Sequence, residues 1–225
     1  MSAKYVLEFR HRPNLYDEIR VRHKRFLSNQ SDLPEAWKIP DEGSTAPSDI
    51  AGELSSIVSL NGALGKGLKG EIVYQLRNES YLRDEAQYDD SFAIEFNAKK
   101  VNYSDLVLKI FPKFVTAFES YRATIYEKSM ARLDWANIVR ESRNSGRDVN
   151  GRDGVYRINA VNYFDRELCR RAFSLLPEQV VDCLKGKVES VSLLGDGVLL
   201  IYSSELMENR DLEKIDSELR SLLHG

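Results

Sequence analysis

The last third of the chain contains two β-rich runs, residues 188–194 and 198–202, separated by Gly195-Asp196-Gly197. Glycine adopts the positive φ angles that other residues resist, so this spacing predicts a β-hairpin with a three-residue turn. We therefore expect a compact core that contains a β-sheet.

The remaining patterns alternate between strand and helix without a regular order. Strand patterns lie at 5–10, 71–77, 92–96 and 154–161. Helical patterns lie at 15–27 (opened by Asn14), 49–60, 106–111, 113–126, 165–173 (opened by Asp165), 177–184 and 212–223. Residues 129–139 fit helix and strand equally, and residues 141–154 are typical of a loop. The sequence predicts a single α+β domain, residues 1–225, in which a mixed or antiparallel sheet packs against several helices.

The sequence contains no pattern typical of a membrane-spanning helix or of a secretory signal. The longest apolar runs fall far short of the roughly 20 residues that cross a bilayer. The N-terminal segment carries Lys4, Glu8 and Arg10 and lacks the apolar core of a secretory signal. Cys169 and Cys183 form no CxxC motif, which favours buried structural cysteines over a disulfide. We expect a cytoplasmic protein.

Charge is segregated along the chain, although its total is only −3. Residues 31–98 contain 5 basic and 13 acidic side chains, a net charge of −8. One interpretation is a normally solvated surface whose charges cancel in the folded protein. The other is an acidic patch that steers a basic partner, such as a nuclease toxin, through long-range attraction. Nucleic acid is a poor ligand for this segment, because phosphates need positive charge. The acidic residues concerned are Glu79, Asp84, Glu85, Asp89 and Asp90.

Two irregular segments are candidates for specific partner contacts. Trp37 is the one large apolar residue in a proline-rich polar segment, where it either docks onto its own core or forms an interface hot spot. Residues 141–153 form a long polar segment that includes Arg147 and Arg152. Long irregular segments of compact domains are often binding surfaces. We therefore expect Trp37, Arg147 and Arg152 to join Asp84, Glu85, Asp89 and Asp90 in partner binding.

No catalytic constellation stands out. The three histidines, His11, His23 and His224, are scattered, and they do not combine with the two cysteines in zinc-binding spacing. Asp89 and Asp90 could contribute to a magnesium site, but neighbours on a strand point to opposite faces and a solvated turn explains them more simply. The sequence therefore predicts no catalytic residue, metal or cofactor, and a protein that is not an enzyme.

Two segments keep an alternative open, namely a small enzyme or a nucleotide-binding or nucleic-acid-binding protein. The glycine-rich segment 62–70 invites a phosphate-loop interpretation, but Gly62 and Gly65 are too close together for a Walker loop and Lys66 is followed by Gly67. A turn-forming loop is the simpler interpretation. The basic segment 140–152 could contact phosphate, although it has no interleaved aromatic residues. Its basic side chains are Arg140, Arg143, Arg147 and Arg152.

The segment Gly151-Arg-Asp-Gly-Val-Tyr-Arg-Ile-Asn-Ala-Val-Asn-Tyr-Phe-Asp165, the helix after it, the hairpin and the terminal helix resemble immunity proteins of bacterial polymorphic toxin systems. The immunity protein 52 family is the nearest, and the resemblance covers mainly residues 151–223. It implies a small α+β protein that binds a cognate toxin and blocks its active site or substrate access. Such families diverge at their toxin-facing surfaces, so the resemblance transfers no binding residue.

Overall fold

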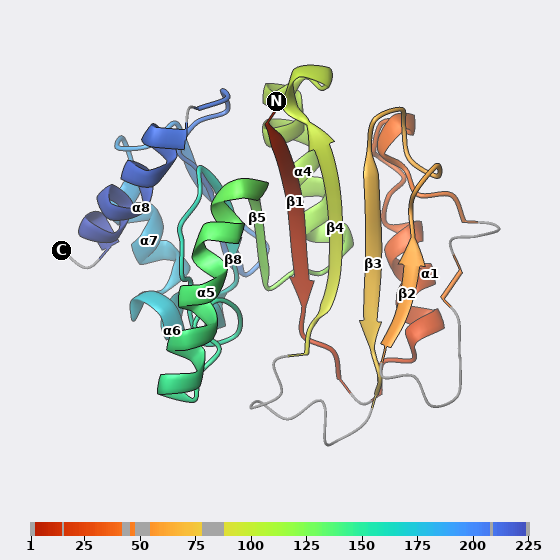
Figure 1. Ribbon diagram of the computed structural model, residues 1–225, viewed down its shortest axis with the longest axis horizontal. Helices are drawn as coiled ribbons and strands as arrows, with labels where there is room; N and C mark the ends of the chain where they lie inside the picture. The colour runs from red at the N-terminus through yellow and green to blue at the C-terminus, as the bar shows by residue number, and fades with distance from the viewer. Residues whose placement is uncertain are drawn as a thin grey trace.

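The computed structural model describes residues 3–14, 16–41, 46–47, 55–77, 88–207 and 209–223. Eight antiparallel strands form one sheet in the order β2-β3-β4-β1-β5-β6-β8-β7 (Figure 1). The α+β class and the antiparallel sheet expected from the sequence are therefore confirmed. The strands are β1 (Lys4–His11), β2 (Ser55–Ser59), β3 (Lys69–Gln75), β4 (Asp90–Asn97), β5 (Arg122–Glu127), β6 (Val161–Phe164), β7 (Ser190–Leu194) and β8 (Gly197–Ile201).

Helices lie on both faces of the sheet (Figure 1). The α-helices are α1 (Ile19–Ser28), α3 (Tyr103–Asp105), α4 (Phe111–Ala117), α5 (Lys128–Ser145), α6 (Arg166–Phe173), α7 (Pro177–Leu184) and α8 (Asn209–Leu223). Shorter helical turns are η1 (Glu35–Trp37), η2 (Ala98–Lys100) and η3 (Leu106–Ile110), the last with π-helical geometry. Among the described residues, no helix has the length and apolar character needed to cross a membrane.

Aromatic side chains build the core under one face of the sheet. Strand side chains alternate between faces, so Phe9 of β1 and Phe92 of β4 lie side by side, with ring centroids 5.2 Å apart. Phe26 of α1 and Phe114 of α4 pack onto Phe92 at 5.2 and 5.0 Å. All four side chains are buried. Helices α1 and α4 therefore cover this face over the β3-β4-β1 part of the sheet.

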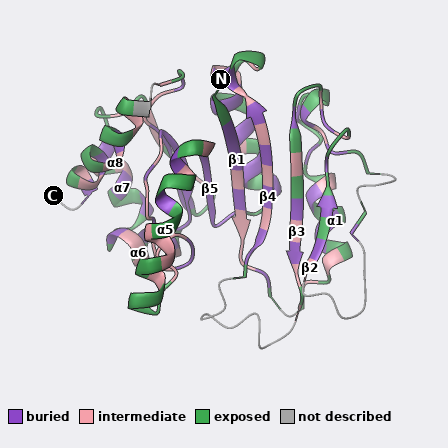
Figure 2. Cartoon of the chain, in the orientation of Figure 1, coloured by how far each residue is buried: buried purple, intermediate pink, exposed green. Residues whose placement is uncertain are grey.

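The opposite face is covered unevenly. Helices α6, α7 and α8 pack over β6 and β8 around Phe164, Leu200 and Leu219, all fully buried. Helix α5 contacts β1 and β5, and in Figure 1 it lies between these strands and helices α6, α7 and α8. Within the described residues, no helix covers this face of β3 and β4, and Figure 2 shows α5 and β3 with much exposed surface. The sheet therefore offers a bare half beside α5.

Local signals in the C-terminal third predicted the structure well. The Asp165 carboxylate accepts a hydrogen bond from the Leu168 amide and caps α6, Pro177 opens α7, and Gly186 follows α7 with a φ of 74°. The hairpin is present, but its turn was predicted one residue too long. Leu194 pairs with Gly197, so only two residues form the turn, with the positive φ (59°) at Gly195.

The middle of the chain departs from expectation at the helix predicted over 113–126. Helix α4 ends at Ala117, and Glu119 adopts a left-handed φ of 48° that breaks the helix. Residues 122–127 form β5, which pairs with β1 on one side and β6 on the other. Pairing on both edges outweighs a local apolar pattern that fits a helix.

Several element boundaries were also wrong. The ambiguous segment 129–139 belongs to α5, which runs into the predicted loop as far as Ser145 and ends at Gly146 (φ 67°). Residues 55–59 are strand β2 and not helix, and residues 48–54 lie outside the described part of the chain. Strand β6 covers only the end of the strand predicted over 154–161. Asn14 caps a turn at Tyr16, and α1 starts only at Ile19.

Both cysteines are free, as the sequence predicted. Cys169 of α6 is buried in the core, whereas Cys183 of α7 is half-buried. Burial raises the pKa of the Cys169 thiol to about 12. A thiol with so high a pKa is inert at neutral pH, so Cys169 has a packing role and not a nucleophilic one.

Candidate functional site

Helix α5 exposes its largest apolar side chains. Met130 and Asp134 are the buried residues of this helix, whereas Leu133 and Trp135 are 69% and 66% exposed. Ile57 of β2 is 59% exposed, and the strand register places it on the same sheet face as α5. Large exposed apolar side chains next to an uncovered sheet are typical of an interaction surface. We call Trp135 and Ile57, with the bare face of β3 and β4, the α5 surface; Leu133, two residues from Trp135, points to another side of the helix.

A depression of about 480 Å³ lies between α5 and the bare sheet. Its floor includes Ala93 of β4 and Tyr126 of β5, and Trp135 stands at its border. Glu95 in its wall pairs with Lys4 at 2.6 Å and with Lys128 at the start of α5. Hydrogen bonds from Lys128 and Lys4 lower the pKa of Glu95 to about 2, so this carboxylate stays charged. The depression therefore has Trp135 at its border and charged side chains in its walls.

Under α5, two arginines lie side by side on the sheet. Arg10 of β1 and Arg122 of β5 are paired in register, and both guanidinium groups donate to the backbone carbonyl of Asn150. Glu8 accepts a hydrogen bond from Arg10 Nε at 3.0 Å. Although burial would raise the pKa of Glu8, the charges of Arg10 and Arg122 outweigh it and hold that pKa below its usual range. This layer is therefore charged, with Arg122 buried and Glu8 and Arg10 half-buried.

The structure brings together two of the predicted partner-binding residues, Asp89 and Arg152. Arg152 Nε lies 2.7 Å from Asp89 Oδ1, and the Tyr121 hydroxyl donates to Asp89 Oδ2 at 2.5 Å. Asp89 is 7% exposed and Arg152 4%. The two residues form an internal ion pair, and the expected solvated position of Asp89 is wrong.

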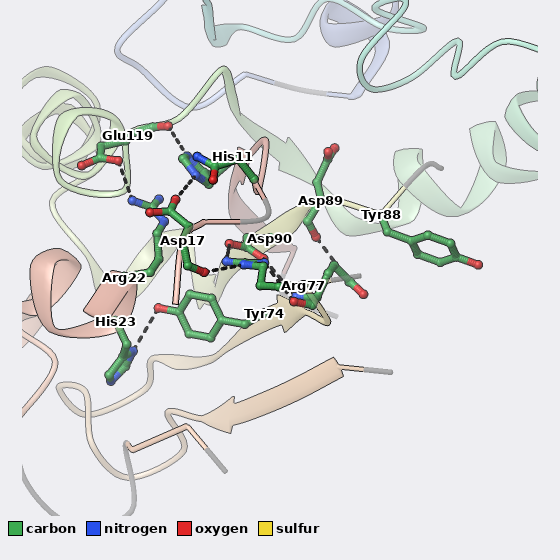
Figure 3. Close-up of polar contacts among 12 residues, drawn as sticks. His11, Asp17, Arg22, His23, Tyr74, Arg77, Tyr88, Asp89, Asp90 and Glu119 are labelled. Atoms are coloured by element: carbon green, nitrogen blue, oxygen red, sulfur yellow. Dashed lines mark hydrogen bonds and ion pairs between the residues drawn. The ribbon is translucent and has the colours of Figure 1, made fainter. Parts of the chain in front are cut away.

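Asp90 is buried too, on the opposite face of β4. Its two oxygens accept hydrogen bonds from Arg77 Nη1 and Nη2, both at 2.8 Å (Figure 3). The backbone amide of Gln75 donates to Asp90 Oδ1 at 3.0 Å. The carboxylate is fully enclosed. A buried carboxylate needs such partners, because an uncompensated charge is very unfavourable away from water. The expected solvated turn is therefore wrong for Asp90 as well.

The other predicted site residues lie apart. Trp37 is 7% exposed and docks onto its own core, the simpler of the two interpretations. Arg147 is exposed and donates to the Asp153 carbonyl at 3.0 Å. Asp84 and Glu85, like Glu79, lie outside the described residues. No described contact therefore joins the seven predicted residues into one patch.

The glycine-rich segment 62–70 is packed inward. The Gly65 amide donates to the Ala36 carbonyl at 2.8 Å, and a side chain at Gly65 would approach Ala36 to 2.9 Å. Leu64 and Leu68 are buried in the core. A phosphate cradle needs free backbone amides, and here one of the central amides is already bonded. The turn-forming interpretation of this segment fits the structure.

His11, at the end of β1, and His23, on α1, make contacts with neighbouring elements of the fold. Because a carbonyl accepts only, His11 Nδ1 must donate to the Glu119 carbonyl, at 2.8 Å (Figure 3). Buried Arg22 pairs with the Glu119 carboxylate at 2.7 Å, and Asp17 lies 3.7 Å from His11 Nε2. His23, farther along α1, bonds to the Tyr74 hydroxyl at 3.0 Å. The described residues contain no group of three or more side chains suited to hold a metal ion.

The surroundings of His11 predict how the stability of the fold depends on pH. Burial and the charge of Arg22 lower the pKa of His11, so folded His11 binds fewer protons than unfolded His11, whose pKa is about 6.5. The free energy of unfolding should therefore decrease as pH falls from 7.5 to 5.5. His11→Asn should make that decrease shallower, measured by urea denaturation at several pH values. Parallel curves for the two proteins would show that His11 does not carry the dependence.

Comparison with known proteins gives no family. No family model matches the chain, and a search of curated proteins finds no match. One similar solved structure is the Pseudomonas aeruginosa T6SS protein PA0821, with 12% sequence identity and a TM-score of 0.43. The alignment covers 88% of this chain and 64% of that protein. At this TM-score the likeness identifies neither a family nor a function.

Proposed function

We propose that this chain is a non-catalytic binding protein, specifically an immunity protein that neutralises a cognate bacterial toxin. It would do so by covering the active site of the toxin or the path of its substrate, within the cytoplasm. The observation that supports this proposal is the α5 surface, with Trp135 exposed beside an uncovered sheet. The resemblance of residues 151–223 to immunity proteins points the same way.

The chemistry of the α5 surface suits a protein partner. Tryptophan is enriched among the residues that dominate binding energy, because a large rigid ring buries much area with little loss of entropy. The depression beside Trp135 can receive a protruding side chain or loop. Helix α5 carries four basic residues and two acidic ones, a net charge of 4 − 2 = +2. The part of the toxin that faces α5 is therefore expected to be acidic.

A toxin that is basic overall, such as a nuclease, is the partner that the acidic segment 31–98 favours. Asp89 and Asp90 add little to long-range attraction, because Arg152 and Arg77 neutralise them. Steering of a basic toxin would then depend on Asp84 and Glu85. The proposal assigns no catalytic residue, metal or cofactor to this chain.

The proposal predicts a stoichiometric protein partner that is toxic by itself. The tagged chain would be purified from its own host at low and moderate salt, and co-purifying proteins identified by mass spectrometry. Expression of the partner alone should arrest growth, and co-expression with this chain should restore it. A partner whose toxicity is unchanged by this chain, or recovery of the chain without any protein partner, would contradict the proposal.

A further inference from the structure

Strand β7 forms one edge of the sheet. It pairs with β8 on one side, and within the described residues no strand pairs with its other side. Leu194 pairs with Gly197 across the two-residue turn, and the backbone groups of successive residues alternate in direction along a strand. Leu194 and every second residue before it therefore direct their N–H and C=O groups to β8. Those of Val191 and Leu193 point outward, away from the sheet.

This edge lacks the features that usually protect an edge strand. Proteins block unpaired edges with charged side chains, prolines or bulges. Strand β7 has the sequence Ser190-Val-Ser-Leu-Leu194, without charge or proline, and it pairs with β8 in an unbroken register. Leu193 is 52% exposed at this edge. The strand therefore offers backbone hydrogen bonds and an apolar side chain to a strand of another molecule.

The side chains of β7 fit a second copy of the same strand. Val191 and Leu193 lie on the sheet face that α7 covers, where they pair with Leu200 and Val198 of β8. In an antiparallel pair centred on Ser192, Val191 of one copy lies opposite Leu193 of the other. Each of these two pairs forms two backbone hydrogen bonds, because the outward N–H and C=O groups meet. Val191 of the second copy then covers the exposed Leu193.

Charge complementarity favours the antiparallel arrangement of two copies. Lys187 precedes β7 and Asp196 lies in the turn that follows it, and both residues are exposed. Antiparallel pairing places the start of one strand beside the end of the other, so Lys187 of each copy lies near Asp196 of the second copy. Glu189, immediately before β7, is directed away to the Ser204 amide, which donates to it at 2.6 Å. A parallel pair would instead bring the two copies of Lys187 together, which is unfavourable.

We propose that β7 is the interface through which two copies of this chain form a dimer, with the two β7 strands antiparallel about Ser192 and one sheet continuing into the other. The pairing leaves the α5 surface open, because β7 is the last strand of the sheet order and β3 and β4 lie near its other end. Dimer formation is therefore independent of toxin binding, and each copy in the dimer keeps its own α5 surface.

Sedimentation equilibrium of the full chain over a range of concentrations measures the dimer directly. Leu193→Lys should raise the dissociation constant of the dimer at least about tenfold, because a lysine at a strand edge opposes pairing. Ile57→Lys is the matched control, since Ile57 is 59% exposed on β2, the other edge strand, and it should leave the dimer intact. A parent chain that stays monomeric at every concentration, or equal dimer formation by the parent and Leu193→Lys, would overturn the proposal.

Leu193→Pro tests the backbone contribution to the dimer. Proline has no N–H, and the N–H of Leu193 points away from β8, so the hairpin should keep its register. The variant should nevertheless weaken the dimer about tenfold or more, because it removes a hydrogen-bond donor from both symmetric pairs. Circular dichroism of the variant shows that the fold is retained. A folded Leu193→Pro that dimerises like the parent chain would contradict pairing through this edge.

Charge exchange tests the direction of pairing and keeps the test decisive if Leu193→Pro does not fold. Lys187→Glu should weaken the dimer about three- to tenfold, because two exposed ion pairs become repulsive contacts with Asp196 of the second copy. Addition of Asp196→Lys should restore the dimer, since opposite charges then meet again. Both residues are exposed, so these variants should fold. A dimer that Lys187→Glu leaves unchanged, or that the added Asp196→Lys weakens further, would overturn the proposal.

Discussion

Asp90→Ala is expected to lower the free energy of unfolding by about 3–5 kcal/mol, the range found when one member of a buried ion pair is removed. Asp90 is fully buried, and both of its oxygens bind Arg77. The substitution leaves the Arg77 guanidinium, whose side chain is 10% exposed, without its counterion. It also leaves the Gln75 amide of β3 without its acceptor. Arg77 also donates to the Asp17 carbonyl. The substitution therefore weakens the contacts that join β3, β4 and the segment before α1.

Glu95→Ala is the matched control, since Glu95 is another carboxylate of β4. Its ion pairs with Lys4 and Lys128 lie at the surface, where the lysine side chains are 61% and 41% exposed. Exposed ion pairs contribute about 0–1 kcal/mol, so this variant should unfold almost like the parent protein. Urea denaturation followed by circular dichroism measures both. Equal losses in the two variants would show that burial of the Asp90 pair is not what stabilises this end of the sheet.

The difference between these carboxylates marks where sequence reasoning failed. In the sequence, Asp89 and Asp90 belong to an acidic segment that resembles a solvated surface. Their partners, Arg152 and Arg77, lie 63 and 13 positions away. Nothing in local composition predicts an ion pair at such distances, because the pairing depends on which strands become neighbours. Arg22 of α1 is a further buried charge whose partners are distant in the sequence, because Glu119 and the Phe118 carbonyl hold it in the interior.

Local signals succeeded where a few adjacent residues determine the backbone. The Asp165 cap, Pro177 at the first turn of α7 and the glycine turn of the β7-β8 hairpin each depend on short-range geometry. The prediction for the residues of β5 was wrong because their apolar pattern also fits a helix. Their pairing with β1 and β6 is long-range, so no local signal indicates it. Element type was therefore predictable near caps and turns, and much less so in the middle of the sheet.

The α5 surface was missed because residues 129–139 showed no clear period. Leu133 and Trp135 are two residues apart, so they cannot both lie on the helical stripe that contains Met130 and Asp134. Once the segment is known to be a helix, large apolar residues outside its buried stripe indicate a surface that another molecule can contact.

Given the proposed function, Trp135→Ala should abolish protection against the toxin. A side chain that dominates an interface contributes about 2 kcal/mol or more when it is truncated, so the dissociation constant should rise at least about 30-fold. The folded chain should be little affected, because Trp135 is 66% exposed. Surface substitutions of this kind change stability by about 0.5 kcal/mol or less. Affinity for the purified toxin and growth in co-expression are the two measurements.

Leu108→Ala supplies the matched control, because Leu108 is 45% exposed on η3 and lies away from the α5 surface. This variant should bind the toxin as tightly as the parent and should protect growth fully. Loss of protection in Trp135→Ala, with full protection in Leu108→Ala, assigns toxin contact to the α5 surface. Retained affinity in Trp135→Ala, measured with a toxin that the parent chain neutralises, would leave the immunity proposal standing. It would move the contact away from the α5 surface, because truncation of the largest apolar side chain of that surface cannot be neutral in an interface that it builds.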